Sequence, residues 1–92
     1  MQVCVVGGAG YIGLITSVGL ASLGRQVSAI DGNRERVEML RRGKSPVLEE
    51  GLESLLQRQL ASGTLRFSDS FDAVDQPPDV VIICVGTPWG RN

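Results

Sequence analysis

The segment that most constrains the fold lies near the start of the chain, where an apolar run leads directly into spaced glycines. Gly8, Gly10 and Gly13 form the pattern G-x-G-x-x-G between two apolar stretches. Asp31 follows 18 residues after Gly13, close to the separation of roughly 20 that is typical of a dinucleotide site. The pattern therefore predicts a strand, a glycine turn, a helix, and an acid at the end of the next strand.

Each glycine has an expected task in such a loop. Gly8 permits a tight turn out of the strand, Gly10 lets the backbone approach a pyrophosphate, and Gly13 lets the helix pack against the sheet. The helix N-terminus adds unpaired N–H groups and the positive end of a dipole, which both attract phosphate. We therefore expect nucleotide binding, and a structural glycine turn without a ligand is the alternative.

Strand-like and helix-like segments alternate along the rest of the chain. The expected strands are 2–6, 26–30, 65–67 and 80–85. The expected helices are 11–23, 52–60 and a helix through Arg42 with Asn33 as its N-cap. The six apolar residues 80–85 are typical of a parallel strand buried on both faces. Right-handed crossovers then predict an α/β fold, a partial Rossmann-type parallel sheet with strand order 3-2-1-4 and helices mainly on one face.

Composition indicates one small domain over residues 1–92, with 42% hydrophobic residues. The net charge of -1 argues against a nucleic-acid or anionic-membrane partner. Cys4 and Cys84 lie in apolar runs, which favours reduced, buried thiols, and the absence of histidine argues against zinc. Residues 1–24 carry no charge but lack the basic start of a signal peptide. We therefore expect a cytoplasmic protein without a metal site.

Several further segments add to the glycine loop. They are Gly8–Leu14, Asp31 with Arg36, Pro46 followed by 49–56, Leu65-x-Phe67, and Val85-Gly86-Thr87-Pro88. Together they resemble the N-terminal NAD-binding domain of the UDP-glucose/GDP-mannose dehydrogenases, over almost the whole chain. A generic Rossmann domain requires neither of the last two segments.

The resemblance implies NAD-dependent oxidation of the C6 alcohol of a nucleotide sugar to a carboxylate. In the family, two hydride transfers pass through an aldehyde held on a cysteine. That cysteine and the Lys and Asn that assist it belong to segments beyond this chain, and Cys4 and Cys84 do not match them, so no catalytic residue is assigned. The resemblance also implies a homo-oligomer at full length, and it leaves open which UDP or GDP sugar is the substrate.

The family's cofactor positions transfer residue by residue. The resemblance places the glycine loop on the pyrophosphate, Asp31 on the adenosine ribose, and Arg36 at the adenosine end. Tyr11 opens the first helix beside the loop, where its hydroxyl faces the cofactor or its ring packs. The implied NAD-binding residues are Gly8, Gly10, Tyr11, Ile12, Gly13, Asp31 and Arg36, with Val85, Gly86 and Thr87 on the nicotinamide side.

The choice between NAD and NADP depends on three charged residues. Asp31 can accept two hydrogen bonds from ribose hydroxyls, and its charge opposes a 2′-phosphate. Arg34 and Arg36 could attract that phosphate, or simply form a solvated helix face. Like charges in contact cost several kcal/mol, whereas a flexible surface arginine contributes roughly 1 kcal/mol or less. We therefore expect NAD.

Two other interpretations remain open at this point. Gly7 creates a second pattern, G-x-x-G-x-x-G, which is similar to the opening of nucleotide-sugar epimerases of the extended short-chain group. A second departure from the dehydrogenase pattern is that the family's Glu-Pro-Gly appears here as Glu49-Glu50-Gly51. The segment at 86–88 favours the dehydrogenases. A small Rossmann module that senses a nucleotide without chemistry is the second alternative.

The chain ends soon after the fourth predicted strand. We therefore expect part of a longer dehydrogenase whose catalytic and sugar-binding parts are absent here. Because only the short 68–78 connection is available for the second face of the sheet, that face and the free edge at 80–85 should expose apolar surface.

Overall fold

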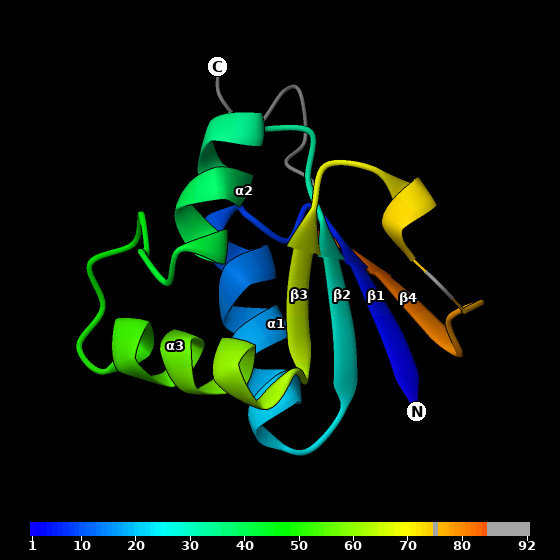
Figure 1. Ribbon diagram of the computed structural model, residues 1–92, viewed down its shortest axis with the longest axis horizontal. Coiled ribbons are helices and arrows are strands. Elements are labelled where there is room, and N and C mark those ends of the chain that lie inside the picture. The colour runs from blue at the N-terminus through cyan, green and yellow to red at the C-terminus, as the bar shows by residue number, and fades with distance from the viewer. Residues whose placement is uncertain (75, 85–92) are drawn as a thin grey trace.

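The computed structural model describes residues 1–74 and 76–84, and its centre is a four-stranded parallel sheet (Figure 1). The strands are β1 (Gln2–Val6), β2 (Gln26–Ile30), β3 (Leu65–Ser68) and β4 (Val80–Ile83). Their order across the sheet is β3-β2-β1-β4, and every neighbouring pair is parallel. The predicted α/β fold and the predicted strand order 3-2-1-4 are confirmed.

Three α-helices cover one face of the sheet, and a single 3-10 turn lies on the other (Figure 1). They are α1 (Tyr11–Ser22), α2 (Arg34–Arg41) and α3 (Leu52–Ser62), and the turn is η1 (Phe71–Ala73). Asn33 caps α2 as predicted, because its side chain accepts a hydrogen bond from the Arg36 N–H at 3.1 Å. The prediction of helices mainly on one face is confirmed.

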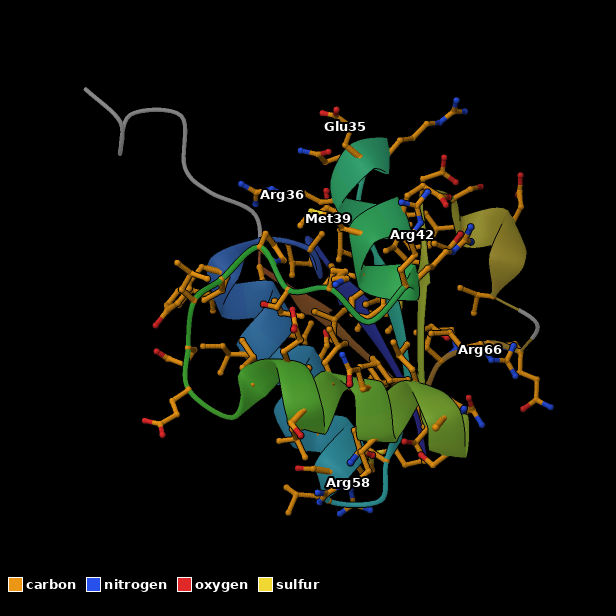
Figure 2. All side chains as sticks on the ribbon, turned by 60° about the vertical axis from the view of Figure 1, so that its left-hand side comes forward. Glu35, Arg36, Met39, Arg42, Arg58 and Arg66 are labelled. Atoms are coloured by element: carbon orange, nitrogen blue, oxygen red, sulfur yellow. The ribbon has the colours of Figure 1, made fainter. Side chains whose placement is uncertain are left out.

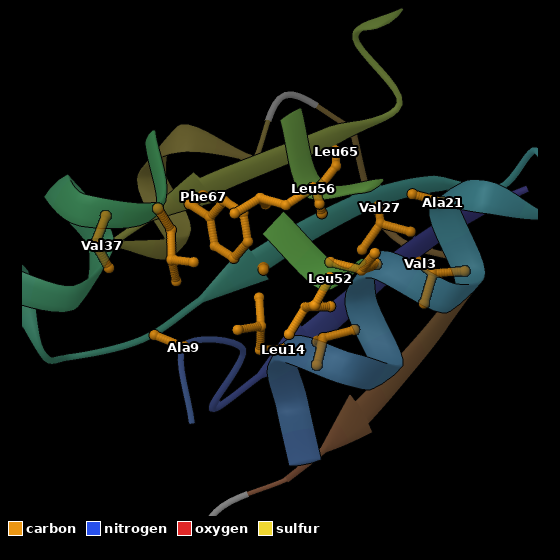
Figure 3. Close-up of a cluster of buried hydrophobic side chains, with 14 residues drawn as sticks. Val3, Ala9, Leu14, Ala21, Val27, Val37, Leu52, Leu56, Leu65 and Phe67 are labelled. Carbon is orange, nitrogen blue, oxygen red and sulfur yellow. The ribbon is translucent and has the colours of Figure 1, made fainter. Parts of the chain in front are cut away.

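Alternating strand residues and the inner stripes of the helices form the core between sheet and helices (Figure 3). Val5 and Val27, on the two central strands, have no exposed surface, and neither do Leu14 of α1 and Leu56 of α3. Burying a side chain of this size stabilises the fold by about 1.5–3 kcal/mol. This packing fixes the directions of the central strands, and therefore fixes where their carboxyl ends meet.

The face opposite the helices is only partly covered, and this corrects one prediction. Val81 and Ile83 of β4 are 50% and 68% exposed, so the strand is not buried on both faces. The reason is topological: β4 pairs only with β1, and no helix of the described residues covers its second face. The expected exposed apolar surface is confirmed for Val80, Val81 and Ile83, whereas Ile82 packs against the core and Val85 lies outside the described residues.

The two cysteines differ in their surroundings. Cys4 is 1% exposed, and burial raises the pKa of its thiol above the ordinary value, so the reactive thiolate is disfavoured. Cys84 follows β4 and is half-buried, which corrects the prediction that both thiols are buried. Both cysteines are free. None of the helices in residues 1–74 and 76–84 has the length and hydrophobicity that a bilayer crossing requires.

Ser17 is the one polar side chain of α1 that the core encloses completely. Its hydroxyl is buried and has no hydrogen-bond partner among the described residues. Burying an unpaired hydroxyl costs free energy that an apolar side chain of similar size avoids. We therefore expect Ser17→Ala to leave the free energy of unfolding unchanged or to raise it by up to about 1 kcal/mol, measured by urea denaturation.

Ser22→Ala, at the end of the same helix, is the matched control. The Ser22 hydroxyl is exposed and donates to the Gly19 carbonyl at 2.7 Å, so its removal should change stability by less than about 0.5 kcal/mol. A loss of more than about 1 kcal/mol in Ser17→Ala alone would show that its hydroxyl stabilises the helix through a partner.

Candidate functional site

The carboxyl ends of the four parallel strands meet at a crevice of about 420 Å³. Every strand contributes a residue at or just after its end to this crevice, as expected for the ligand site of an open parallel sheet. The lining residues are Val6, Gly7, Gly10, Ile30, Asp31, Gly32, Asp69, Phe71 and Cys84.

The turn that leaves β1 is fixed to the end of β2. The N–H groups of Gly7 and Gly8 both donate to the Ile30 carbonyl, at 2.7 and 3.1 Å. Gly7 has φ +85°, so it is the residue that allows the turn, and the task predicted for Gly8 belongs to its neighbour. Gly8 is required for another reason: a Cβ there would lie 2.5 Å from the Ala29 Cβ. The loop therefore rests directly on β2.

Gly13 and Gly10 have different surroundings. A Cβ on Gly13 would collide with the Gly7 carbonyl, so this glycine lets α1 pack closely on the turn that directly follows β1. A Cβ on Gly10 would meet only the Gly7 oxygen, at an ordinary 3.6 Å. Gly10 also precedes α1 and offers no side chain to cap its first N–H groups. The protein itself therefore leaves space at Gly10.

The backbone of Ala9 is held from both sides by charged side chains. Its N–H donates to Oδ2 of Asp31 at 3.0 Å, and its carbonyl accepts from Nη1 of Arg36 at 3.4 Å. Oδ1 of Asp31 accepts a second hydrogen bond, from the Asn33 N–H at 2.9 Å. The acid after β2 therefore connects the glycine loop to the start of α2, and its carboxylate faces the loop as the motif requires.

The other predicted site residues either do not line the crevice or lie outside the described residues. Tyr11 and Ile12 are 52% and 61% exposed and do not line the crevice. Their backbone N–H groups lie in the first turn of α1. The packing alternative for Tyr11 finds no support in this exposure. Val85, Gly86 and Thr87 lie outside the described residues.

Arg36 also borders a second, shallower groove of about 570 Å³ on the outer side of α2. Figure 2 shows Arg36, Met39 and Arg42 projecting from this helix, close to the chain that leads into α3. The groove is separate from the crevice at the strand ends, since the two share no lining residue. Arg36 lies between them and reaches the glycine loop.

Asp69 and Phe71 are among the crevice residues that were not predicted from the sequence. Asp69 and Phe71 follow β3 and form the wall opposite the glycine loop, and the Phe71 side chain is 58% exposed. The available signal was positional: residues just after a strand that pairs with β2 must emerge beside Asp31. In residues 1–74 and 76–84 no cluster of His, Cys, Asp and Glu side chains could hold a metal ion.

The close packing of Gly13 on the turn yields a test of the loop. Gly13→Ala places a methyl group against the Gly7 backbone, which cannot yield without moving the loop, so we expect a loss of about 2 kcal/mol or more in unfolding free energy. Thermal denaturation of the intact protein measures it. Gly19→Ala in the same helix meets no atom within 4 Å and should stabilise the protein by about 0.5–1 kcal/mol. Equal effects of the two variants would refute the packing role of Gly13.

The chain was compared with curated relatives and with solved structures. It is 46% identical over 92 residues to a UDP-glucose 6-dehydrogenase of Pseudomonas aeruginosa, covering 100% of this chain and 20% of the relative. It is 39% identical over 88 residues to a UDP-glucose 6-dehydrogenase of Bacillus subtilis, covering 96% of this chain and 20% of the relative. The chain thus spans about a fifth of the length of these relatives.

The similar structures agree in fold. A ternary complex of GDP-mannose dehydrogenase from Pseudomonas aeruginosa superposes with a TM-score of 0.87 at 35% identity, covering 96% of this chain and 20% of that one. A UDP-glucose dehydrogenase from the archaeon Pyrobaculum islandicum gives a TM-score of 0.84 at 41% identity, covering 95% and 20%.

The model of one protein family matches the whole chain, residues 1–92. This match agrees with the resemblance based on the glycine loop and Asp31, and it decides against the epimerase interpretation. The chain belongs to the UDP-glucose/GDP-mannose dehydrogenase family and corresponds to its NAD binding domain.

Proposed function

We infer that this chain is the cofactor-binding part of an enzyme that oxidises the C6 alcohol of UDP-glucose, or of a related UDP or GDP sugar, to the carboxylate with NAD. The observation that carries the inference is the crevice in which the glycine loop and Asp31 meet. The names of the similar proteins, UDP-glucose and GDP-mannose dehydrogenases, support this substrate class. In such an enzyme, bound NAD accepts hydride from the substrate carbon.

The residues of the loop fit a dinucleotide's phosphates. Gly10 leaves space where a larger side chain would fill the approach to the loop, and no side chain caps the first turn of α1. The N–H groups of Tyr11, Ile12 and Gly13 lie in that first turn, where a helix leaves its donors without intrahelical partners. These donors and the positive end of the helix dipole would bind the pyrophosphate.

Asp31 is suited to hold the adenosine ribose. Each of its carboxylate oxygens accepts one hydrogen bond from the protein, Oδ2 from Ala9 and Oδ1 from Asn33. A carboxylate can accept about four hydrogen bonds, so each oxygen can take one more, from the 2′- or the 3′-hydroxyl. The contacts to the protein fix the carboxylate before a ligand arrives, which lowers the entropic cost of binding.

The same carboxylate selects against a 2′-phosphate. A phosphate in place of the 2′-hydroxyl would bring a negative charge against Asp31, which is half-buried beside the loop. Arg36 contacts the Ala9 carbonyl, so attracting a phosphate would compete with an existing contact. The balance of these charges supports NAD as the cofactor.

Turnover tests the proposed reaction. The intact protein should reduce NAD in the presence of UDP-glucose, GDP-mannose or an N-acetylated UDP sugar, with two NADH formed per sugar because an alcohol becomes a carboxylate. Absorbance at 340 nm and mass spectrometry of the sugar product measure both quantities. NAD binding without oxidation of any of these sugars would instead favour a sensing module, and an epimerised product would contradict the proposal.

A substitution at Asp31 tests the cofactor geometry. Asp31→Asn keeps the shape of the side chain but loses its charge and part of its accepting capacity, so we expect the affinity for NAD to fall by about ten- to a hundredfold. The ratio of NAD to NADP affinity should also fall, by about tenfold or more. Isothermal titration with both cofactors measures the two changes.

Asp72→Asn is the control, because it removes the same charge from η1 without touching the crevice lining. This variant should bind both cofactors as the unchanged protein does. If Asp31→Asn behaved in the same way, the assignment of Asp31 to the ribose would be wrong.

A further inference from the structure

We propose that Asp69, just after β3, is a second determinant of cofactor choice, because it pairs with Arg34 and keeps that guanidinium from a 2′-phosphate. The inference rests on the NAD-binding function proposed above and adds to it a residue outside the glycine loop and outside β2. Its basis is the placement of Asp69 in the crevice and the ion pair that it forms there.

The sheet brings Asp69 beside Asp31. In the parallel pairing of β2 with β3, Ile30 lies opposite Ser68, so the next residue of each strand leaves the sheet at the same edge. The Asp31 N–H donates to the Ser68 carbonyl at 3.0 Å, which extends the pairing to the acid itself. Both carboxylates therefore line the same crevice of about 420 Å³.

Arg34 reaches the edge of the crevice through Asp69, although Arg34 itself lines the neighbouring groove along α2. It is the first residue of α2, three residues after Asp31, and in dinucleotide sites that accept NADP a nearby arginine binds the 2′-phosphate. Here the Nε of Arg34 donates to Oδ2 of Asp69 at 2.8 Å. The guanidinium is therefore engaged on the wall opposite the glycine loop.

The second arginine of this region is engaged as well. Arg36 donates to the Ala9 carbonyl, so both cations near the ribose site already have partners in the protein. Arg34 is the one whose partner is a side chain, and substitution can remove that partner without altering the backbone. Substitution of Asp69 therefore removes the partner of the Arg34 guanidinium.

The ion pair of Arg34 with Asp69 contributes little to the stability of the fold, so its removal should change cofactor binding without unfolding the protein. The side chains of Arg34 and Asp69 are 86% and 35% exposed, and exposed ion pairs of this kind add little stability. Asp69→Ala should therefore fold normally. Its thermal midpoint can be compared with that of Glu38→Ala, which breaks the exposed ion pair of Glu38 with Arg41 on the same helix, away from the crevice.

The experiment measures the dissociation constants of NAD and NADP for four variants of the intact protein. In Asp69→Ala the freed Arg34 should raise the affinity for NADP by about three- to fivefold, while the affinity for NAD changes by less than about twofold. Adding Arg34→Ala to Asp69→Ala should remove the gain. Arg34→Ala alone and Glu38→Ala should leave both affinities close to those of the unchanged protein. The gain should shrink at about 0.5 M NaCl, because salt screens an exposed arginine–phosphate contact.

The outcomes separate this inference from the function on which it rests. If Asp69→Ala leaves NADP affinity unchanged, or if the double variant keeps the gain, Arg34 is not what Asp69 controls and the inference is overturned. In that case NAD binding that depends on Asp31 would leave the proposed function intact. If the unchanged protein binds no NAD, the proposed function itself fails.

Discussion

The site depends on the backbone of one residue, Ala9, which is held between a carboxylate and a guanidinium. Asp31 accepts from its N–H and Arg36 donates to its carbonyl, so the glycine loop is fixed by side chains from the far end of β2 and from α2. The Ile30 carbonyl adds two backbone hydrogen bonds to the same loop. The loop, the acid and the first turn of α1 therefore keep a fixed relation without a ligand, which is the preorganisation that tight recognition requires.

The three α-helices support the glycine loop and Asp31 from one face of the sheet. Helices α1, α2 and α3 bury one face of the sheet, and that core sets the spacing of β1 and β2 at the point where the loop begins. The opposite face of β4 carries exposed valine and isoleucine side chains. Among the described residues, no helix covers this face of the strand, so its apolar side chains stay exposed to solvent.

Much of this could be predicted from the sequence, because the decisive signals are local. The N-cap at Asn33 and the helix over 52–60 depend on short-range chemistry, and the structure confirms both within a few residues. The acid after β2 followed from its spacing to the glycines. These features do not depend on how distant segments pack.

The predictions that were wrong or absent concern contacts between segments that are distant in the sequence. The motif alone could not show that Gly7 takes the positive φ, because the turn is set by contact of Gly8 with Ala29 on the next strand. The burial of 80–85 on both faces was inferred from its apolar composition alone, against the exposed second face that the predicted topology indicated and that the structure shows at Val81 and Ile83. The place of Asp69 beside Asp31 follows from the pairing of β2 with β3, a positional signal that the predicted strand order already contained but that was not used.

The contacts that shape the glycine loop have a consequence for how the protein assembles during synthesis. The hydrogen bonds from Asp31 and Arg36 to Ala9 span 22 and 27 residues, whereas the pair of Arg34 with Asp69 spans 35. Closing short chain segments costs less entropy, and chains fold from the amino end as they emerge from the ribosome. The glycine loop with its contacts to Asp31 and Arg36 can therefore form from the β1–α1–β2 unit and the first turn of α2, and the ion pair of Arg34 with Asp69 forms once β3 has been added.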